Sequence, residues 1–356
     1  MKRTIASLLS LALLLGLLAG CSGAPRTIAA VNGQNVAIGY YTVQSMMARV
    51  ELENSQGDNY PAFISQTGSD GRTFAEVYND SYRKAFATFY AIKLQFEALG
   101  LSIDDSRLKA YDVEYSTFRA NFRSDADYRT FLRKCGMSEA EHKQIYKELI
   151  YDQEILYAHF FDPDKGTEVP NEAAVRAYFD ELVQLAVKHI LFYVPTTDQS
   201  GNALSEAEIA ENRQKAREEA ADVLARIQAG TLSFNTAMNE LSDDSDLKSY
   251  PGGYGFLPNE EGFPACFTEA ATTLAPGEMG IYESDYGVHI IQTIEPSALF
   301  SAQQSLYQKA LQNEIFTRKC SEWVDQLQIS YNEAALAYCD FGKSELSNIY
   351  LASENS

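Results

Sequence analysis

Residues Tyr286–Ile291 read YGVHII, and this stretch decides the fold together with its counterpart VKHILF at Val187–Phe192. Both are apolar runs rich in β-branched residues, and such runs indicate buried strands. Each contains a histidine, His289 or His189, although the whole chain has only 4 histidines. A single histidine in an apolar strand is more often a satisfied core residue than a functional one. Two histidines in matching runs are candidate site residues.

The segments around these two runs predict a small α+β unit. They read as a polar loop (195–204), a long helix that begins at Ser205 and ends at Gly230, a shorter helix (233–241), a loop rich in Gly, Asp, Ser and Pro (242–262), a helix (267–274) and two strands (281–284 and 287–294). The order is therefore strand, two helices, loop, helix and two strands. Such an order predicts a compact unit with a small sheet that contains antiparallel pairs.

Helices dominate the rest of the sequence. Residues 27–38 read as a hairpin, because Asn32-Gly33 is a strong type I′ turn signal between β-prone arms. From there to about residue 182 the pattern is helical, and in residues 73–98 apolar side chains recur every three or four positions. One more amphipathic helix covers residues 302–329. The sequence thus predicts an α+β protein in which a mostly helical part accompanies the small sheet-containing unit.

The N-terminus has the features of an export signal. Met1-Lys2-Arg3 is positively charged, and residues 4–20 carry no charge and have a short apolar centre. The stretch Leu18-Ala19-Gly20-Cys21 that follows resembles the lipobox of bacterial lipoproteins. That resemblance implies removal of residues 1–20 and lipidation of Cys21, which would anchor the chain to a membrane. The alternative is an ordinary signal peptide followed by a chance cysteine.

The net charge limits the classes of binding partner, and the cysteine spacing bears on zinc sites and disulfides. The chain has 49 acidic and 29 basic residues, a net charge of −20, and loss of Lys2 and Arg3 would make it more negative still. This charge argues against nucleic acid and anionic lipid as partners, and it suits positively charged segments of client proteins. The other cysteines match no zinc pattern. A disulfide is compatible with an exported protein, with Cys320 and Cys339 as the nearest pair, but unpaired core cysteines are equally compatible. These cysteines are Cys135, Cys266, Cys320 and Cys339.

Five segments, in a fixed order, resemble the parvulin family of peptidyl-prolyl cis/trans isomerases. They are VKHILF (187–192), RIQAGTLSFNTAMNELSDDSD (226–246), PGGYGFLP (251–258), FTEAATTLAPGEMG (267–280) and DYGVHII (285–291). Each segment alone is a weak signal, whereas the ordered set is specific. The resemblance covers residues 185–296.

The whole chain is similar to extracytoplasmic foldases of the PrsA and SurA type, since TIAAVNGQNVAIGYYTVQSM (27–46) resembles the start of their chaperone domain. The resemblance implies a helical chaperone domain built from both ends of the chain and a separate parvulin domain. The expected parts are a signal peptide (1–20), an N-terminal helical domain (21–184), the parvulin domain (185–296), a C-terminal helix on the chaperone domain (297–340) and a flexible tail (341–356). The expected location is the extracytoplasmic face of a bacterial cell membrane.

The resemblance also implies the site residues. His189 and His289 match the two histidines of the parvulin motif, and Asp244 matches the acidic or cysteine position before Gly252-Gly253, with its neighbours Asp243 and Ser245 as alternatives. We therefore expect His189, Asp244 and His289 to be catalytic. Substrate-binding residues are expected at positions that form the proline pocket or hold the second histidine: Tyr254, Leu257, Phe263, Phe267, Ser284 and Tyr286.

The predicted activity is rotation about X–Pro bonds in unfolded exported proteins. No covalent bond breaks in this reaction, so no metal or cofactor is expected. The loop after the first strand lacks Lys and Arg, which predicts no preference for a phosphorylated residue before proline. The rival hypothesis is a holdase that binds clients without useful catalysis. A calcium loop at SDDSDLKSYPGG (242–253) is a weaker alternative, because the stretch has no glutamate at its twelfth position as an EF-hand has. A homodimer is compatible with the sequence.

Overall fold

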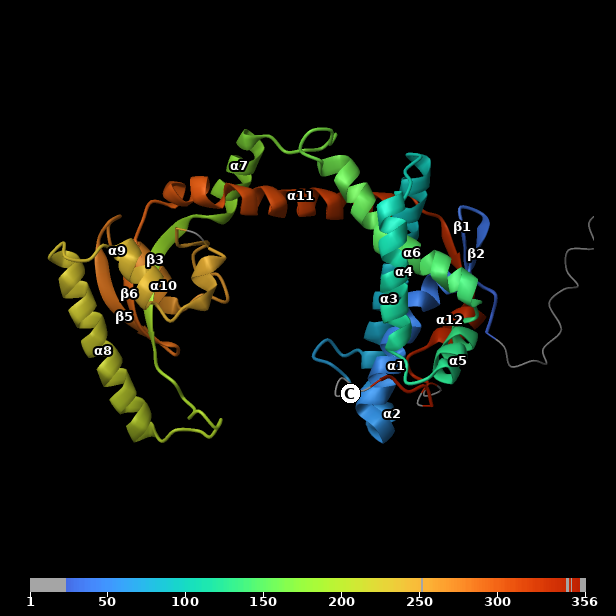
Figure 1. Ribbon diagram of the computed structural model, residues 1–356, viewed down its shortest axis with the longest axis horizontal. Coiled ribbons are helices and arrows are strands. Elements are labelled where there is room, and N and C mark those ends of the chain that lie inside the picture. The colour runs from blue at the N-terminus through green and yellow to red at the C-terminus, as the bar shows by residue number, and fades with distance from the viewer. Residues whose placement is uncertain (1–23, 251, 344–345, 347, 353–356) are drawn as a thin grey trace, which may run out of the picture. The chain divides into compact units, whose positions relative to one another are not determined.

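The computed structural model describes residues 24–250, 252–343, 346 and 348–352 (Figure 1). The predicted signal peptide and Cys21 lie outside these residues. The chain forms two compact units: one combines residues up to Thr167 with those from Phe316 onward, and the other is Glu168–Ile315. The first unit thus contains both ends of the described chain. The predicted fold class, a helical part built from both chain ends plus a parvulin-like part, is confirmed.

The first unit is mainly helical. Its elements are β1 (Thr27–Val31), β2 (Gln34–Ala37), α1 (Gly39–Gln56), η1 (Gly57–Asn59), α2 (Tyr60–Ile64), α3 (Phe74–Ala98), α4 (Asp105–Ala120), α5 (Asp125–Cys135), α6 (Glu139–Phe161), the last part of α11 (Phe300–Asp325), β7 (Ile329–Tyr331) and α12 (Glu333–Cys339). Strand β1 pairs antiparallel with β2 and with β7, so a three-residue strand near the C-terminus completes the N-terminal hairpin. The predicted turn is present, since Asn32 and Gly33 have φ angles of 49° and 81°.

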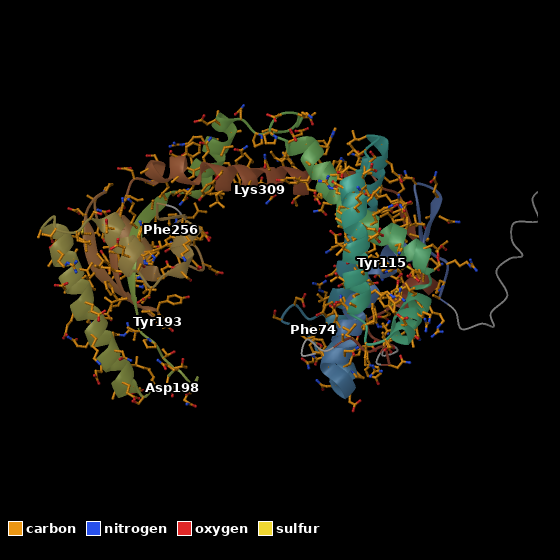
Figure 2. All side chains as sticks on the ribbon, in the orientation of Figure 1. Phe74, Tyr115, Tyr193, Asp198, Phe256 and Lys309 are labelled. Carbon is orange, nitrogen blue, oxygen red and sulfur yellow. The ribbon has the colours of Figure 1, made fainter. Side chains whose placement is uncertain are left out.

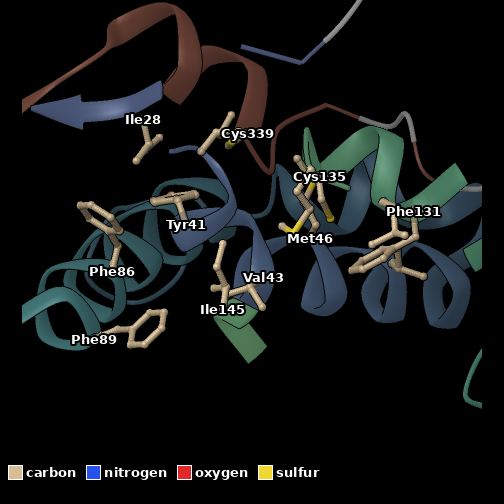
Figure 3. Packing of buried hydrophobic residues seen from close by; sticks show 14 of the residues in the cluster. Ile28, Tyr41, Val43, Met46, Phe86, Phe89, Phe131, Cys135, Ile145 and Cys339 are labelled. Carbon is tan, nitrogen blue, oxygen red and sulfur yellow. The ribbon is translucent and has the colours of Figure 1, made fainter. Parts of the chain in front are cut away.

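Aromatic and aliphatic side chains from distant segments form the core of the first unit. Ile28 of β1, Tyr41 of α1 and Phe86 of α3 gather near one another in Figure 3. Local sequence signals fix where the helices start: Thr73 and Ser138 each form a capping box, with Glu76 and Glu141. The stripe predicted over residues 73–98 thus becomes a helix that packs its apolar face into this core.

The C-terminal segment after α12 differs from the predicted flexible tail. Phe341 is fully buried and stacks on Tyr78 and Tyr82 of α3. The carboxylate of Glu53 accepts a hydrogen bond from the backbone N–H of Leu346. Apolar burial and a buried carboxylate thus hold Phe341 and Leu346 on the helical unit. Sequence periodicity gives no signal for such irregular packing.

The second unit contains α7 (Glu172–Leu182), β3 (Leu185–Tyr193), α8 (Glu206–Gln228), α9 (Phe234–Leu241), η2 (Ser245–Lys248), β4 (Tyr254–Phe256), α10 (Ala265–Thr273), β5 (Met279–Ser284), β6 (Gly287–Thr293), η3 (Pro296–Leu299) and the first part of α11 (Phe300–Asp325). Its sheet has the order β4-β3-β6-β5, and every pair is antiparallel. Strand β4 lies within the stretch that the sequence predicted as a loop. It has only three residues and follows Gly252-Gly253, so no alternation could reveal it.

The second unit extends beyond the predicted limits 185–296. Phe179 of α7 packs its ring against Phe300 and Tyr307 of α11, with centroid distances of 5.4 and 4.9 Å. These contacts, with buried Val183 and Leu299 beside them, join α7 and the start of α11 to the sheet-containing unit.

The two faces of the four-stranded sheet have separate cores. Ile190, Val288 and Ile290 pack with residues of α8 and α9 on one face. Val187 and Ile291 pack with Phe267 of α10 on the other face. Because neighbouring residues of a strand point to opposite faces, His189 and His289 lie on the α10 face.

Two further observations bear on the sequence predictions. Cys135, Cys266, Cys320 and Cys339 are all buried free thiols, so the nearest-pair disulfide is absent from the described residues. Within the same residues, no helix combines the length and apolar character that a bilayer span requires.

Candidate functional site

The pairing of β3 with β6 brings the two histidines together. In this antiparallel register His189 lies opposite Ile291, and His289 lies opposite Leu191. The histidines are therefore diagonal neighbours on one face of two central strands. Gly287 starts β6 with a φ of 151°, and a Cβ at this position would lie 2.2 Å from the carbonyl oxygen of Phe192. Only glycine permits this close approach, which explains its place two residues before His289.

The two imidazole rings bond to each other inside the unit. The two Nδ1 atoms lie 3.1 Å apart, and the ring centroids are 5.4 Å apart. His189 is 2% exposed and His289 is 1% exposed. Phe267 packs its ring against both histidines, at centroid distances of 4.8 and 5.7 Å.

Asp244 extends the histidine pair on one side. Its Oδ2 lies 2.6 Å from Nε2 of His189 and accepts a hydrogen bond of 2.8 Å from the hydroxyl of Tyr254. Its Oδ1 accepts from the backbone N–H of Asp246, because Asp244 caps the short helix η2. Burial raises the pKa of Asp244, but the hydrogen bonds from His189 and Tyr254 outweigh it and lower the pKa to about 2. The carboxylate is therefore ionised at neutral pH.

The alternatives to Asp244 have other positions. The carboxylate of Asp243 accepts a hydrogen bond from the backbone N–H of Tyr193. Tyr193 is the last residue of β3 and is labelled in Figure 2. Ser245 is the first residue of η2. Of the three adjacent candidates, Asp244 is the one bonded to His189.

Ser284 extends the pair on the other side. Its Oγ lies 2.7 Å from Nε2 of His289, and it accepts the backbone N–H of Tyr286 at 3.1 Å. Burial, followed by the neighbouring His189, lowers the pKa of His289 to about 4, although Asp244 opposes the shift. His289 is therefore neutral at physiological pH.

One assignment of protons satisfies the whole chain of contacts with two neutral rings. His189 donates its Nε2–H to Asp244, so its Nδ1 accepts from Nδ1–H of His289. Nε2 of His289 then carries a lone pair, and the hydroxyl of Ser284 donates to it. Every nitrogen of both rings has a partner inside the protein, so the rings hold Asp244 in place and need no substrate contact to be satisfied.

A cavity of about 300 Å³ opens beside this network. Its lining residues are His189, Leu191, Asp244, Asp246, Tyr250, Tyr254, Gly262, Phe263, Pro264, Phe267, Tyr286 and His289. Phe263, Phe267 and the ring of Tyr254 form an aromatic wall, in which the Tyr254 centroid lies 5.9 Å from that of Phe263. Among these lining residues the formal charges are two aspartates, with no Lys or Arg.

The structure thus brings together most of the residues predicted from the sequence. His189, Asp244, His289, Tyr254, Phe263, Phe267 and Tyr286 line the cavity, whereas Leu257 and Ser284 do not appear in its wall. Ser284 contacts His289 directly, as expected from its position, while Tyr286 reaches Ser284 through its backbone N–H.

Sequence reasoning missed the lining residues Leu191, Asp246, Tyr250, Gly262 and Pro264. The alternation of side chains in β3 could have placed Leu191 on the same face as His189. Nothing in the loop composition marked the others.

Comparisons with known proteins locate the same region. Residues 189–295 match the family described as Rotamase, the PPIC-type PPIASE domain. Chaperone SurA of Sodalis glossinidius (strain morsitans) is 28% identical over 121 residues, which are 33% of this chain. The chain spans only 28% of the length of that relative.

Solved structures give weaker likenesses. The crystal structure of PrsA from Bacillus subtilis matches 74% of this chain and 90% of its own, with 17% identity and a TM-score of 0.31. A structure from the study of the SurA-like chaperones PEB4 and Cj1289 of Campylobacter jejuni matches 86% of this chain and 99% of its own, with 8% identity and a TM-score of 0.28.

Proposed function

We propose that this chain, whose residues 189–295 form a parvulin-type peptidyl-prolyl isomerase domain, accelerates rotation about X–Pro bonds of unfolded proteins outside the cytoplasm. The family match confirms the resemblance seen in the five ordered segments. The observation that carries the proposal is an ionised carboxylate, Asp244, held by His189 and Tyr254 at the wall of an aromatic cavity.

The energetics of the reaction explain what such a site achieves. Amide resonance makes the barrier to rotation about 18–20 kcal/mol, and it places partial negative charge on the carbonyl oxygen of the planar bond. In the twisted state this charge is reduced, because the nitrogen lone pair no longer conjugates with the carbonyl. A carboxylate near the oxygen therefore disfavours the planar forms more than the twisted one.

The aromatic wall acts in the same direction. Phe263, Phe267 and Tyr254 would hold the pyrrolidine ring and exclude water from the amide. Water stabilises the planar amide through hydrogen bonds to its oxygen, so its exclusion lowers the difference between the planar and twisted states. In this mechanism Asp244 faces the substrate, and His189, His289 and Ser284 keep its carboxylate oriented and ionised.

The experiment is prolyl-limited refolding. An unfolded protein whose slow refolding phase is X–Pro isomerisation is refolded with the wild-type chain, with Asp244→Ala and with Asp243→Ala. The wild type and Asp243→Ala should accelerate the slow phase, whereas Asp244→Ala should lose most of the acceleration. Equal acceleration by all three proteins would remove Asp244 from the mechanism.

The proposal extends to the location of the chain. Lipidation of Cys21 would anchor the protein to the outer face of a bacterial membrane, with the remaining chain exposed to exported proteins. A Cys21→Ala variant should be recovered in the aqueous phase after detergent phase separation, and the wild type in the detergent phase. Recovery of both in the aqueous phase would contradict lipid anchoring.

A holdase activity is the second candidate. The observation in its favour is a cavity of about 270 Å³ in the helical unit, lined partly by Phe89 and Ile92 of α3 and Leu149 of α6. If holding is the main activity, Asp244→Ala should suppress aggregation of an unfolded client as well as the wild type does. A homodimer is a further prediction, which the molar mass measured by light scattering would test.

A further inference from the structure

The helical unit contains a charged cavity that the proposed isomerase site does not use. It has a volume of about 240 Å³ and lies among α3, α4 and α6. These helices are shown in Figure 1, and Arg107 of α4 bonds to Glu154 of α6. The cavity is lined by Lys93, Phe96, Glu97, Ile103, Leu108, Gln144, Lys147, Glu148 and Asp152.

Most of the charges in this wall neutralise one another. Nζ of Lys93 lies 2.5 Å from Glu97 and 3.4 Å from Glu148. Glu148 also accepts hydrogen bonds from the hydroxyl of Tyr40, at 3.0 Å, and from the side-chain amide of Gln144, at 2.7 Å. The carboxylate of Glu148 is therefore satisfied inside the protein, and the half-exposed carboxylate of Glu97 pairs with Lys93.

Asp152 is the exception. It is 2% exposed, and among the residues that the structure describes none forms a hydrogen bond or ion pair with its carboxylate. Nζ of Lys147, the other cation of the wall, donates instead to the side-chain oxygen of Gln144 at 3.0 Å. Burial, followed by repulsion from Glu148, raises the pKa of Asp152 to about 7.

A buried carboxylate without a partner is costly, and a cation bound beside it would remove that cost. Among the described residues no group of carboxylates, histidines and cysteines is arranged to hold a metal ion. The rest of the wall favours an organic cation, because Phe96, Ile103 and Leu108 offer apolar surface to a methylene chain. The net charge of −20 also attracts basic polypeptide segments.

We propose that this cavity binds a lysine or arginine side chain of a client polypeptide, with its cationic head on Asp152 and its methylene stem against Phe96, Ile103 and Leu108. The choice of a polypeptide rests on the proposed action on unfolded proteins. The preference for a cation rests on the wall of the cavity and on the net negative charge of the chain. The helical unit would thereby select basic segments of the chains that it holds.

The test is direct binding of short unstructured peptides to the full chain by fluorescence anisotropy. Three labelled peptides differ only at one central residue, which is lysine, arginine or norleucine, and none contains proline. We expect the two basic peptides to bind at least about tenfold more tightly than the norleucine peptide, as a partly buried charge-assisted contact would give. Equal affinity of all three peptides would overturn the proposal.

Two variants locate the effect. Asp152→Asn keeps the shape of the side chain but removes its charge, and it should abolish the preference for the basic peptides. Asp112→Asn is the matched control, because it removes one exposed charge of α4 outside the cavity. A preference that survives in Asp152→Asn would overturn the proposal, as would its loss in both variants.

The pH dependence of the wild type provides a readout that needs no variant. Asp152 ionises as pH rises, so affinity for the lysine peptide should increase between about pH 6 and pH 8, while the norleucine peptide shows no such increase. The charged groups facing Asp152 are Lys93 and Glu97 from α3, and Lys147 and Glu148 from α6. A pH-independent lysine affinity would contradict the role of Asp152.

Turnover of an X–Pro peptide, measured separately, should be unchanged in Asp152→Asn, so failure of this proposal is distinguishable from failure of the isomerase proposal.

Discussion

Replacement of Asp244 by asparagine tests the network at its charged end. The change keeps the shape of the side chain but removes the charge that accepts from His189 and Tyr254. The pKa of Asp244 falls from 3.8 to about 2 on folding, and about two pKa units correspond to about 2.5 kcal/mol. Because the carboxylate faces a cavity open to solvent, we discount this figure to about 1–2 kcal/mol of unfolding free energy at pH 7.

The sign of the pH dependence follows from the lowered pKa. The stabilisation is complete well above pH 3.8, and it disappears as pH falls through the folded-state value of about 2. Urea unfolding at pH 7 should therefore separate wild type from Asp244→Asn by about 1–2 kcal/mol, and the difference should shrink at pH 3. Asp243→Asn, which changes a carboxylate of the same loop that is bonded to the backbone of Tyr193, is the matched control.

The same variant should lose activity. Without the carboxylate, the site no longer disfavours the planar amide, and we expect a roughly 10- to 100-fold lower rate constant for an X–Pro peptide. The reasoning is refuted if Asp244→Asn isomerises the peptide at the wild-type rate, or if both asparagine variants lose stability equally at every pH.

Three further predictions concern protonation and close packing. Isomerase activity should be constant above about pH 6 and fall in acid with a midpoint near pH 4, because protonation of His289 would break the hydrogen-bond chain. A pH–rate profile with no loss of activity by pH 4 would contradict this. Gly287→Ala should destabilise the protein by about 3 kcal/mol or more, because its Cβ would collide with the carbonyl oxygen of Phe192, and an unchanged melting temperature would refute that clash. Asp152→Asn should raise the unfolding free energy, by an amount that grows from pH 4 to pH 7 up to about 4 kcal/mol, because the wild type must bury a carboxyl group whose pKa is raised to about 7. Denaturant unfolding across this pH range that shows no such increase would contradict the burial of an unpaired carboxylate.

Local signals explain what the sequence could predict. The runs around His189 and His289 are long enough and apolar enough to be recognised as strands. Their order with the intervening segments predicted the family that residues 189–295 match. The capping serine and threonine residues fixed helix starts, since their effect depends only on residues three positions away. The Asn32-Gly33 turn is local in the same sense.

Long-range contacts explain what the sequence could not predict. Strands β4 and β7 have three residues each, and their existence depends on partners far away in the chain. The bond between Tyr254 and Asp244 joins the first residue of β4 to the residue that caps η2, so Tyr254, expected only as a substrate-binding residue, also completes the network. Burial of Asp152 follows from the packing of α6 against α3, and no residue pattern marked it as different from a solvated carboxylate.

The most direct test of the central claim is two-dimensional exchange NMR on a short X–Pro peptide with and without the chain. The account predicts exchange cross-peaks between the cis and trans resonances in the presence of wild-type protein, although the uncatalysed process takes tens of seconds or longer. The cross-peaks should be strongly reduced with Asp244→Asn. Binding of the peptide to the wild-type cavity, seen as shifted resonances, without faster exchange would contradict catalysis and leave a binding function in its place.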